Sequence, residues 1–280
     1  MGRRPDLDRF RRALLMLVPG AAAVYLAFRS GGAAAGLPAL FAVSCLGALL
    51  LRAAPGTLDA AVVSRVANAA LLALPGALTA YFAFNAGGFF PETPALVAIV
   101  LILVLVVRVT TAEDPFAGFS WPLAVASGAL GLYCLWTLLS GTWSDAPARA
   151  LIEFDRALVY LLALVLFGSI PRSSDSLRWM VRGVALAIVA AVVAAFLTRT
   201  LPDVFTFHPG LDAGRLGWPL TYWNALGIFG AVGAILCLHL TASLREPLPV
   251  RVLAAAALPL IGATVLLTFS RGGIGVGLAG

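Results

Sequence analysis

Long apolar segments, each about as long as a membrane is thick, constrain this chain more than any other feature. A hydrocarbon core of about 30 Å takes roughly 20 helical residues. Hydrophobic residues make up 61% of the 280 residues and charged residues only 11%, a composition that no soluble domain requires. The sequence therefore predicts an all-α, polytopic membrane protein with about nine complete transmembrane helices and the start of a tenth after Arg271. The nine predicted runs are residues 13–28, 33–51, 66–84, 94–109, 121–139, 157–171, 179–198, 219–241 and 250–269.

The arginines indicate how these segments are oriented. All 19 basic residues are arginine, and cytoplasmic loops carry an excess of basic residues. With a cytoplasmic N-terminus, 13 arginines fall on the cytoplasmic side and 6 on the outer side. The count favours that orientation, with residues 1–12 as the cytoplasmic anchor of the first helix. The six outer arginines are Arg29, Arg149, Arg156, Arg199, Arg215 and Arg271.

Several classes of function lack their motifs. The chain has no G-x-x-x-x-G-K-[ST], H-E-x-x-H or G-x-S-x-G pattern, which argues against ATP hydrolysis, zinc proteolysis and serine hydrolysis. Cys45, Cys134 and Cys237 lie in apolar runs without CxxC spacing and are interpreted as buried hydrophobic side chains. The net charge of +6 is not gathered on a soluble domain, so it does not indicate a nucleic acid partner. We expect no metal and no cofactor.

The domain organisation is expected to be simple. No soluble domain, tandem repeat or long linker interrupts the apolar runs, so residues 1–280 are predicted to form one transmembrane helical domain. His208 and His239 fall on opposite sides in this topology. His239 is interpreted as an interfacial residue, and a role for His208 as a general base stays open.

The outer connector after residues 121–139 contains a helix start. Asp145 is expected to be the N-cap, and the spacings of four and three place Arg149, Glu153 and Arg156 on one face. One interpretation is an interfacial helix stabilised by ion pairs, with Trp143 at the headgroup level. The other is that the same residues adjoin a site on the outer face.

The longest outer connector runs from residue 199 to about residue 219 and leads into the next apolar helix. Tyr222 and Trp223 fit an aromatic belt at the membrane interface. Asn224 lies at the entry of the apolar helix, where an amide requires a partner. The N-terminus of a helix that points outward also offers free N–H groups to an anion.

Arg271 lies between two apolar runs. A guanidinium does not lose its proton, and at the centre of a membrane helix it costs about 2.5–3.5 kcal/mol on insertion scales. Two interpretations stay open. Arg271 either extends to the interface or pairs with an outer carboxylate such as Asp155 or Asp212, or it forms with Arg215 a site for a negatively charged ligand.

Three short segments in the second half of the chain resemble the O-antigen ligase and polysaccharide polymerase family of bacterial membrane proteins. The most telling is a Ser-Arg-Gly that follows an apolar helix. The resemblance covers residues 139–280, while the first half is similar only in being a row of membrane helices. The segments are residues 143–147 (WSDAP), residues 215–219 (RLGWP) with 224–227 (NALG), and residues 267–273 (LTFSRGG).

The resemblance implies a fold of the metal-independent, lipid-sugar glycosyltransferase type in the bacterial cytoplasmic (inner) membrane. Such proteins transfer a glycan from a polyprenyl diphosphate carrier to an acceptor at the outer face, by ligation or by polymerisation. It further implies that Arg215 and Arg271 hold the diphosphate and stabilise the leaving group. The supporting residues would be Asn224, Ser270, Trp143 and Asp145.

One departure from the family limits what the resemblance implies. Family members carry a large outer loop beyond the Ser-Arg-Gly segment, with a histidine and further basic residues for the transfer step, and this sequence ends before that loop. We therefore expect a truncated family domain, and two alternatives stay open: it transfers the glycan, or it binds the donor without catalysis. We assign no catalytic base, since the position of His208 does not match.

Two further classes of function stay open. One is a membrane transporter or flippase for a lipid-linked or anionic substrate, which paired repeats with broken helices would favour. The sequence shows no convincing repeat of that kind. The other is a non-catalytic scaffold.

Overall fold

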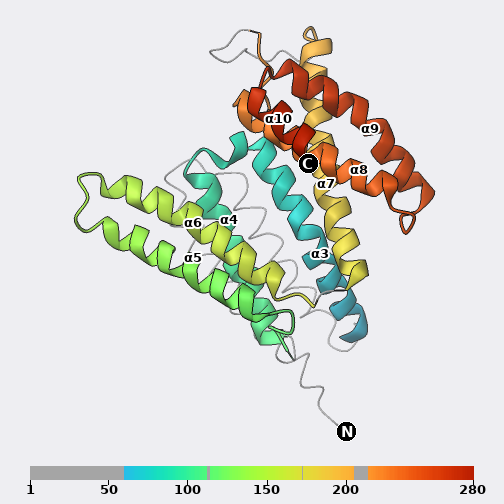
Figure 1. Ribbon diagram of the computed structural model, residues 1–280. Helices are drawn as coiled ribbons and strands as arrows, with labels where there is room; N and C mark the ends of the chain where they lie inside the picture. The colour runs from blue at the N-terminus through green and yellow to red at the C-terminus, as the bar shows by residue number, and fades with distance from the viewer. Residues whose placement is uncertain (1–59, 112–113, 172, 205–213) are drawn as a thin grey trace. The chain divides into compact units, whose positions relative to one another are not determined.

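The computed structural model describes residues 60–111, 114–171, 173–204 and 214–280 (Figure 1). Every regular element in these ranges is helical, and they contain no strand. The prediction of an all-α protein is therefore confirmed for the described part of the chain. The predicted runs at residues 13–28 and 33–51 lie outside it, as do Cys45, His208 and Asp212.

Each predicted run from the third to the ninth coincides with a helix. Four of these helices, α5, α7, α8 and α9, are long and apolar enough to cross a membrane, which supports a multi-pass membrane protein. The helices are α3 Ala60–Phe84, α4 Glu92–Thr111, α5 Trp121–Ser140, α6 Pro147–Gly168, α7 Ser174–Thr200, α8 Trp223–Ala242, α9 Leu248–Leu267 and α10 Arg271–Ala279, with a short 3-10 turn, η1, at Ala86–Gly88.

The surfaces of these helices are apolar. Leu132 on α5, Leu186 on α7 and Leu253 on α9 are 69%, 70% and 71% exposed. A helix that is hydrophobic all round has to be buried, either in a large protein core or in lipid. Because these side chains are not covered by protein, lipid is the environment that suits them.

The described helices pack as two compact units. Unit one contains α4, α5 and α6, and unit two contains residues 69–84 of α3 together with η1, α7, α8, α9 and α10. The single domain expected over residues 1–280 stays a prediction.

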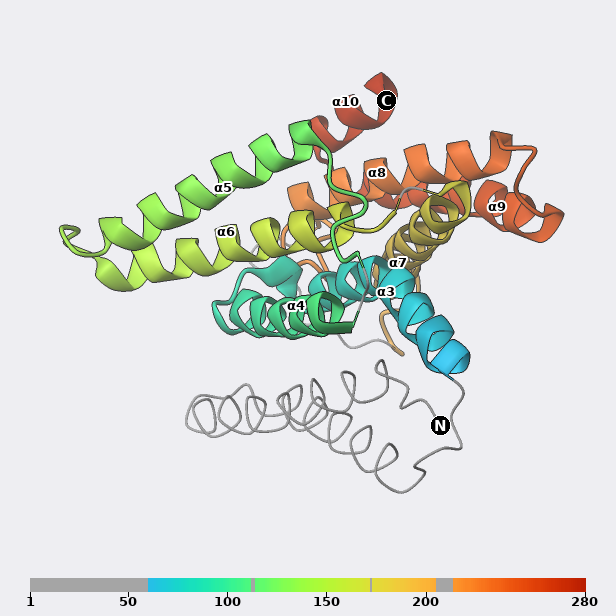
Figure 2. The ribbon, with the colours of Figure 1, turned by 90° about the horizontal axis from the view of Figure 1, so that it is seen from below.

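In unit one, α5 and α6 run antiparallel and side by side (Figure 2). The end of α4 is attached to the end of α6 by Arg108, which donates from Nε to Ser169 Oγ at 2.7 Å and from Nη2 to the Ser169 carbonyl at 2.8 Å. Ser169 is fully buried, and its carbonyl also accepts from the Gly118 N–H at 3.2 Å. The Arg108 cation also interacts favourably with the negative, C-terminal ends of the α4 and α6 dipoles.

The start of α6 corrects one prediction. Asp145 is not the N-cap, because that position belongs to Ala146, and Pro147 is the first helical residue. Proline suits this position, since its φ is already helical and it has no N–H to leave unpaired. The side chain of Ser144 accepts the Ala146 N–H at 3.1 Å.

The expected interfacial helix is continuous with the run predicted at residues 157–171. Both belong to α6, which runs unbroken from Pro147 to Gly168. The expected ion pair forms between Arg156 and Glu153, with 2.7 Å between Nη1 and Oε1. Charged residues in the first half of α6 had made one helix look like two segments.

The core of unit two lies between α7, α8 and α9. Its centre is formed by Ile188, Val192, Cys237 and Ile261, none of them more than 1% exposed. The prediction that Cys134 and Cys237 are buried thiols is confirmed. Small residues also allow α3 to approach α7, since a Cβ added to Gly76 would lie 2.6 Å from the Gly183 carbonyl carbon.

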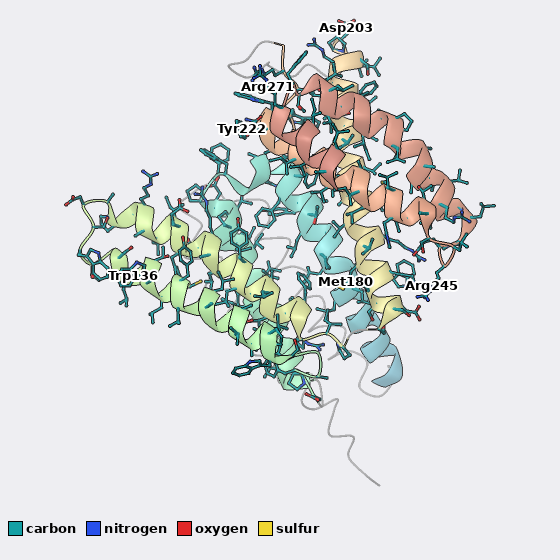
Figure 3. The ribbon with its side chains drawn as sticks, viewed as in Figure 1. Trp136, Met180, Asp203, Tyr222, Arg245 and Arg271 are labelled. Atoms are coloured by element: carbon teal, nitrogen blue, oxygen red, sulfur yellow. The ribbon has the colours of Figure 1, made fainter. Side chains whose placement is uncertain are left out.

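The two ends of unit two differ in whether their arginines have hydrogen-bond or ion-pair partners. Figure 3 shows Arg245 at one end and Tyr222 and Arg271 at the other. At the Arg245 end, Arg182 on α7 pairs with Glu246 in the turn before α9, with 2.6 Å between Nη2 and Oε2. The Glu246 side chain is 1% exposed, so this turn is attached to α7 by a buried ion pair.

Replacing Glu246 with Gln should destabilise the protein by on the order of 3 kcal/mol, because it leaves the largely buried Arg182 guanidinium without its counter-charge. Asp175→Asn is the matched control. It breaks the ion pair of Arg178 with Asp175, whose side chain is 76% exposed, and should cost less than about 1 kcal/mol. The free energy of unfolding in mixed micelles measures both, and equal losses would contradict the structural role of Glu246.

Candidate functional site

The segment before α8 folds back onto the end of α9. The Leu216 N–H donates to the Leu267 carbonyl at 3.1 Å. Leu216, Leu220 and Leu226 are buried in a cluster with Ala83 of α3 and with Ala191 and Ala195 of α7. The non-helical segment that carries Arg215 is therefore held against the ends of several helices, beside the turn that leads to Arg271.

Ser270 fixes the start of α10. Its Oγ accepts the Gly273 N–H at 3.1 Å, as an N-cap does. Its own N–H donates to Thr268 Oγ1 at 3.2 Å, and that hydroxyl donates to the Val265 carbonyl at 2.6 Å. Because Ser270 and Thr268 are both buried, the turn is rigidly bonded, and Arg271 becomes the first, exposed residue of α10.

Two glycines allow α10 to pack closely against α8. A Cβ added to Gly273 would lie 2.6 Å from the Gly227 carbonyl carbon, and one added to Gly227 would lie 2.7 Å from the Ser270 Cβ. Backbone atoms cannot move aside as a flexible side chain can. The position of Arg271 therefore depends on direct backbone contact between the two helices.

Backbone strain occurs in both turns. Thr221 has φ +65° and Phe269 has φ +52°, values that are uncommon for residues other than glycine. Each directly precedes an N-cap residue, Tyr222 for α8 and Ser270 for α10. Such conformations cost of order 1–3 kcal/mol each and persist only where the surrounding structure determines them.

The aromatic residues at the start of α8 are linked to the charged ones. The Arg215 guanidinium lies over the Trp223 ring, 5.1 Å from its centroid, within cation–π range. The ring centroids of Tyr222 and Trp223 are 4.9 Å apart. The hydrogen-bond partner that the Asn224 amide requires is the Tyr222 hydroxyl, since Asn224 Nδ2 donates to Tyr222 Oη at 2.7 Å.

The arginines of this end have no ion-pair partner among the residues that the structure describes, although the acidic Asp203 lies at the same end of unit two (Figure 3). Arg215 and Arg271 are exposed, and within the described ranges neither guanidinium has a hydrogen bond or an ion pair. Arg182 and Arg251, at the opposite end, are bound to Glu246 and to the Thr241 carbonyl. The two groups of arginines therefore differ in their surroundings.

Helix dipoles add to the positive charge. Both α8 and α10 begin at this end, at Trp223 and Arg271, and the first N–H groups of a helix have no partner within it. A cation at a helix start is unfavourable with respect to the dipole. An anion bound here would be attracted by both arginines and by both helix starts.

The other predicted site residues, Trp143 and Asp145, belong to the other unit. Both are exposed, and in unit one Trp143 contacts Trp136 with 5.6 Å between ring centroids. Asp155, considered as an ion-pair partner of Arg271, belongs to the same unit. His239 is exposed in the last turn of α8, away from the start of that helix.

Two sets of contacts at this end of unit two were not predicted from the sequence. Tyr222 and Trp223 were interpreted only as an aromatic belt, although their place between Arg215 and Asn224 was a signal for a cation–π contact and a side-chain hydrogen bond. The contact between Gly227 and Gly273 had no signal beyond the presence of small residues.

Within the described residues, no group of three His, Cys, Asp or Glu side chains is placed to hold a metal ion.

Comparisons of the chain with protein-family models, with curated proteins and with solved structures found no match. The resemblance to the O-antigen ligase family therefore rests on the three short sequence segments alone. It stays a prediction.

Gly273→Ala should destabilise the protein by about 1–3 kcal/mol, because the new methyl group would collide with the backbone of Gly227. Gly272→Ala, one residue earlier in the same helix, is the control. A Cβ there meets nothing within 4 Å, and alanine favours a helix over glycine by up to about 1 kcal/mol. Thermal unfolding in detergent should separate the two variants, and equal melting temperatures would contradict the close contact.

Proposed function

We propose that this protein binds a polyprenyl diphosphate-linked glycan at the Arg215–Arg271 end of unit two and transfers the glycan to an acceptor. The proposal places this end at the outer face of the bacterial cytoplasmic membrane, with a cytoplasmic N-terminus and nine complete membrane crossings. The observation that supports it most is the hydrogen bond from Leu216 to Leu267. That bond holds together the two segments whose arginines were predicted to share a ligand.

The chemistry of the site suits a diphosphate. Guanidinium groups form charge-assisted hydrogen bonds with phosphate oxygens, and these are about twice as strong as neutral ones. During transfer, an acceptor hydroxyl attacks the anomeric carbon, and the bond from that carbon to the phosphate oxygen breaks. The electron pair goes to the diphosphate, where donors already in place stabilise the developing charge. The base that takes the acceptor's proton is not assigned.

The surroundings of the site suit a lipid carrier. Large apolar side chains near this end are exposed, among them Leu266 and Phe269 at 62% and 61%. A polyprenyl chain in the bilayer would lie beside such surfaces while its headgroup stays at the interface. A soluble anion would gain nothing from them, so the ligand we propose has both an anionic and an apolar part.

Arg271→Ala should weaken binding of a polyprenyl diphosphate at least tenfold and abolish glycan transfer in proteoliposomes, because it removes a charge-assisted contact to the leaving group. Binding is measured on the protein in nanodiscs that contain the lipid, and transfer by the gain of glycan on the acceptor. Membrane insertion should not change and the melting temperature should not fall, since the side chain is exposed.

The matched control is Arg245→Ala. Arg245 is also exposed, in the same unit but at its opposite end (Figure 3), so the same loss of charge there should leave binding unchanged. Unchanged binding and transfer in Arg271→Ala would disprove the proposal. Movement of the lipid-linked glycan across vesicles without transfer would instead favour a flippase.

A further inference from the structure

The hydroxyl group of Tyr222 is a hydrogen-bond donor without a described acceptor. We infer that Tyr222 donates this hydrogen to a phosphate oxygen of the bound polyprenyl diphosphate, and that Asn224 is a positioning residue that keeps the hydroxyl in this direction. The inference rests on the proposed function. It adds to the two arginines a neutral donor that the sequence assigned only to an aromatic belt.

The direction of the hydroxyl follows from its one hydrogen bond. Asn224 Nδ2 donates to Tyr222 Oη at 2.7 Å, so the phenol oxygen is the acceptor in this contact. A tyrosine hydroxyl has a single hydrogen, which therefore points away from the Asn224 amide nitrogen. Within the described ranges no acceptor for it is found, and Tyr222 is 49% exposed.

The position of Tyr222 places this donor among the cationic groups. Tyr222 is the N-cap of α8, and its ring packs on Trp223, which itself lies under the Arg215 guanidinium. Tyr222 and Arg271 lie at the same end of unit two (Figure 3). A donor here joins two guanidiniums and two helix starts, all of which favour an anion.

The strained backbone next to Tyr222 supports a functional role. Thr221 has φ +65°, a conformation that threonine adopts only at a cost. A tyrosine that merely anchors a helix at the membrane interface needs neither this strain nor a hydrogen bond from an amide to its hydroxyl. Strain of this kind clusters at binding sites, where it holds side chains in place for a ligand.

Tyr222→Phe tests the role of the hydroxyl, because it removes one oxygen and keeps the ring that packs on Trp223. Binding of a synthetic polyprenyl diphosphate to the protein in nanodiscs should weaken about ten- to hundredfold, the usual effect of losing a hydrogen bond to a charged group. Tyr160→Phe is the control, since Tyr160 is 65% exposed on α6, and it should bind like the unmodified protein. Equal melting temperatures would show that both variants are folded.

A double-mutant cycle tests the role of Asn224. Asn224→Ala alone should weaken binding, but in the Tyr222→Phe background it should have almost no further effect, because Asn224 acts only through the tyrosine hydroxyl. Additive losses would overturn the positioning role. A structural role alone would change the melting temperature without this dependence on Tyr222.

The outcomes separate this inference from the proposed function. If the unmodified protein binds the lipid and Arg271→Ala does not, but Tyr222→Phe binds normally, only the role of Tyr222 is wrong. That result would mean that the Tyr222 hydroxyl makes no hydrogen bond to the bound lipid. If the unmodified protein does not bind the lipid at all, the proposed function and this inference are both wrong.

Discussion

The hydrogen bond from the Leu216 N–H to the Leu267 carbonyl determines where the charged residues of unit two lie. In a membrane protein, irregular backbone is tolerated only where protein or a water-filled cavity satisfies its polar groups. The segment before α8 meets this condition because its backbone bonds to the end of α9 and its leucines are buried against α3, α7 and α8. Arg215 and the turn before Arg271 are neighbours as a consequence.

This arrangement divides the arginines of unit two into two kinds. Arg182, Arg178 and Arg251 have carboxylate or carbonyl partners at the end where α7 and α9 begin. Those contacts stabilise the helix ends, and the two carboxylates offset the charges of Arg178 and Arg182. At the other end, Arg215 has only the face of Trp223 as a described partner, and an aromatic face does not neutralise a guanidinium. Among the described residues, Arg215 and Arg271 therefore differ from Arg182, Arg178 and Arg251 in having no carboxylate or carbonyl partner.

Within the described part of the chain, each predicted run overlaps a helix, because lipid-sized apolar runs allow few other folds. The predicted N-cap of α6 was wrong. The helix begins at Pro147, so its N-cap is Ala146, and the Ala146 N–H donates to the side chain of Ser144 and not to that of Asp145. The prediction separated α6 into two segments because Glu153 and Arg156 lower the local hydropathy although they pair with each other. The contacts of Gly273 with Gly227 and of Asn224 with Tyr222 depend on how the helix ends meet, which periodicity does not specify.

Arg271 is unfavourably placed for stability alone. It is the first residue of α10, where a helix dipole repels a cation, and it follows Phe269, whose φ of +52° is itself strained. The buried bonds of Ser270 and Thr268 and the contact of Gly273 with Gly227 hold it there nonetheless. Such rigid support fixes the backbone from which the exposed Arg271 side chain extends, and a fixed backbone is what the proposed binding of a diphosphate requires of its first ligand.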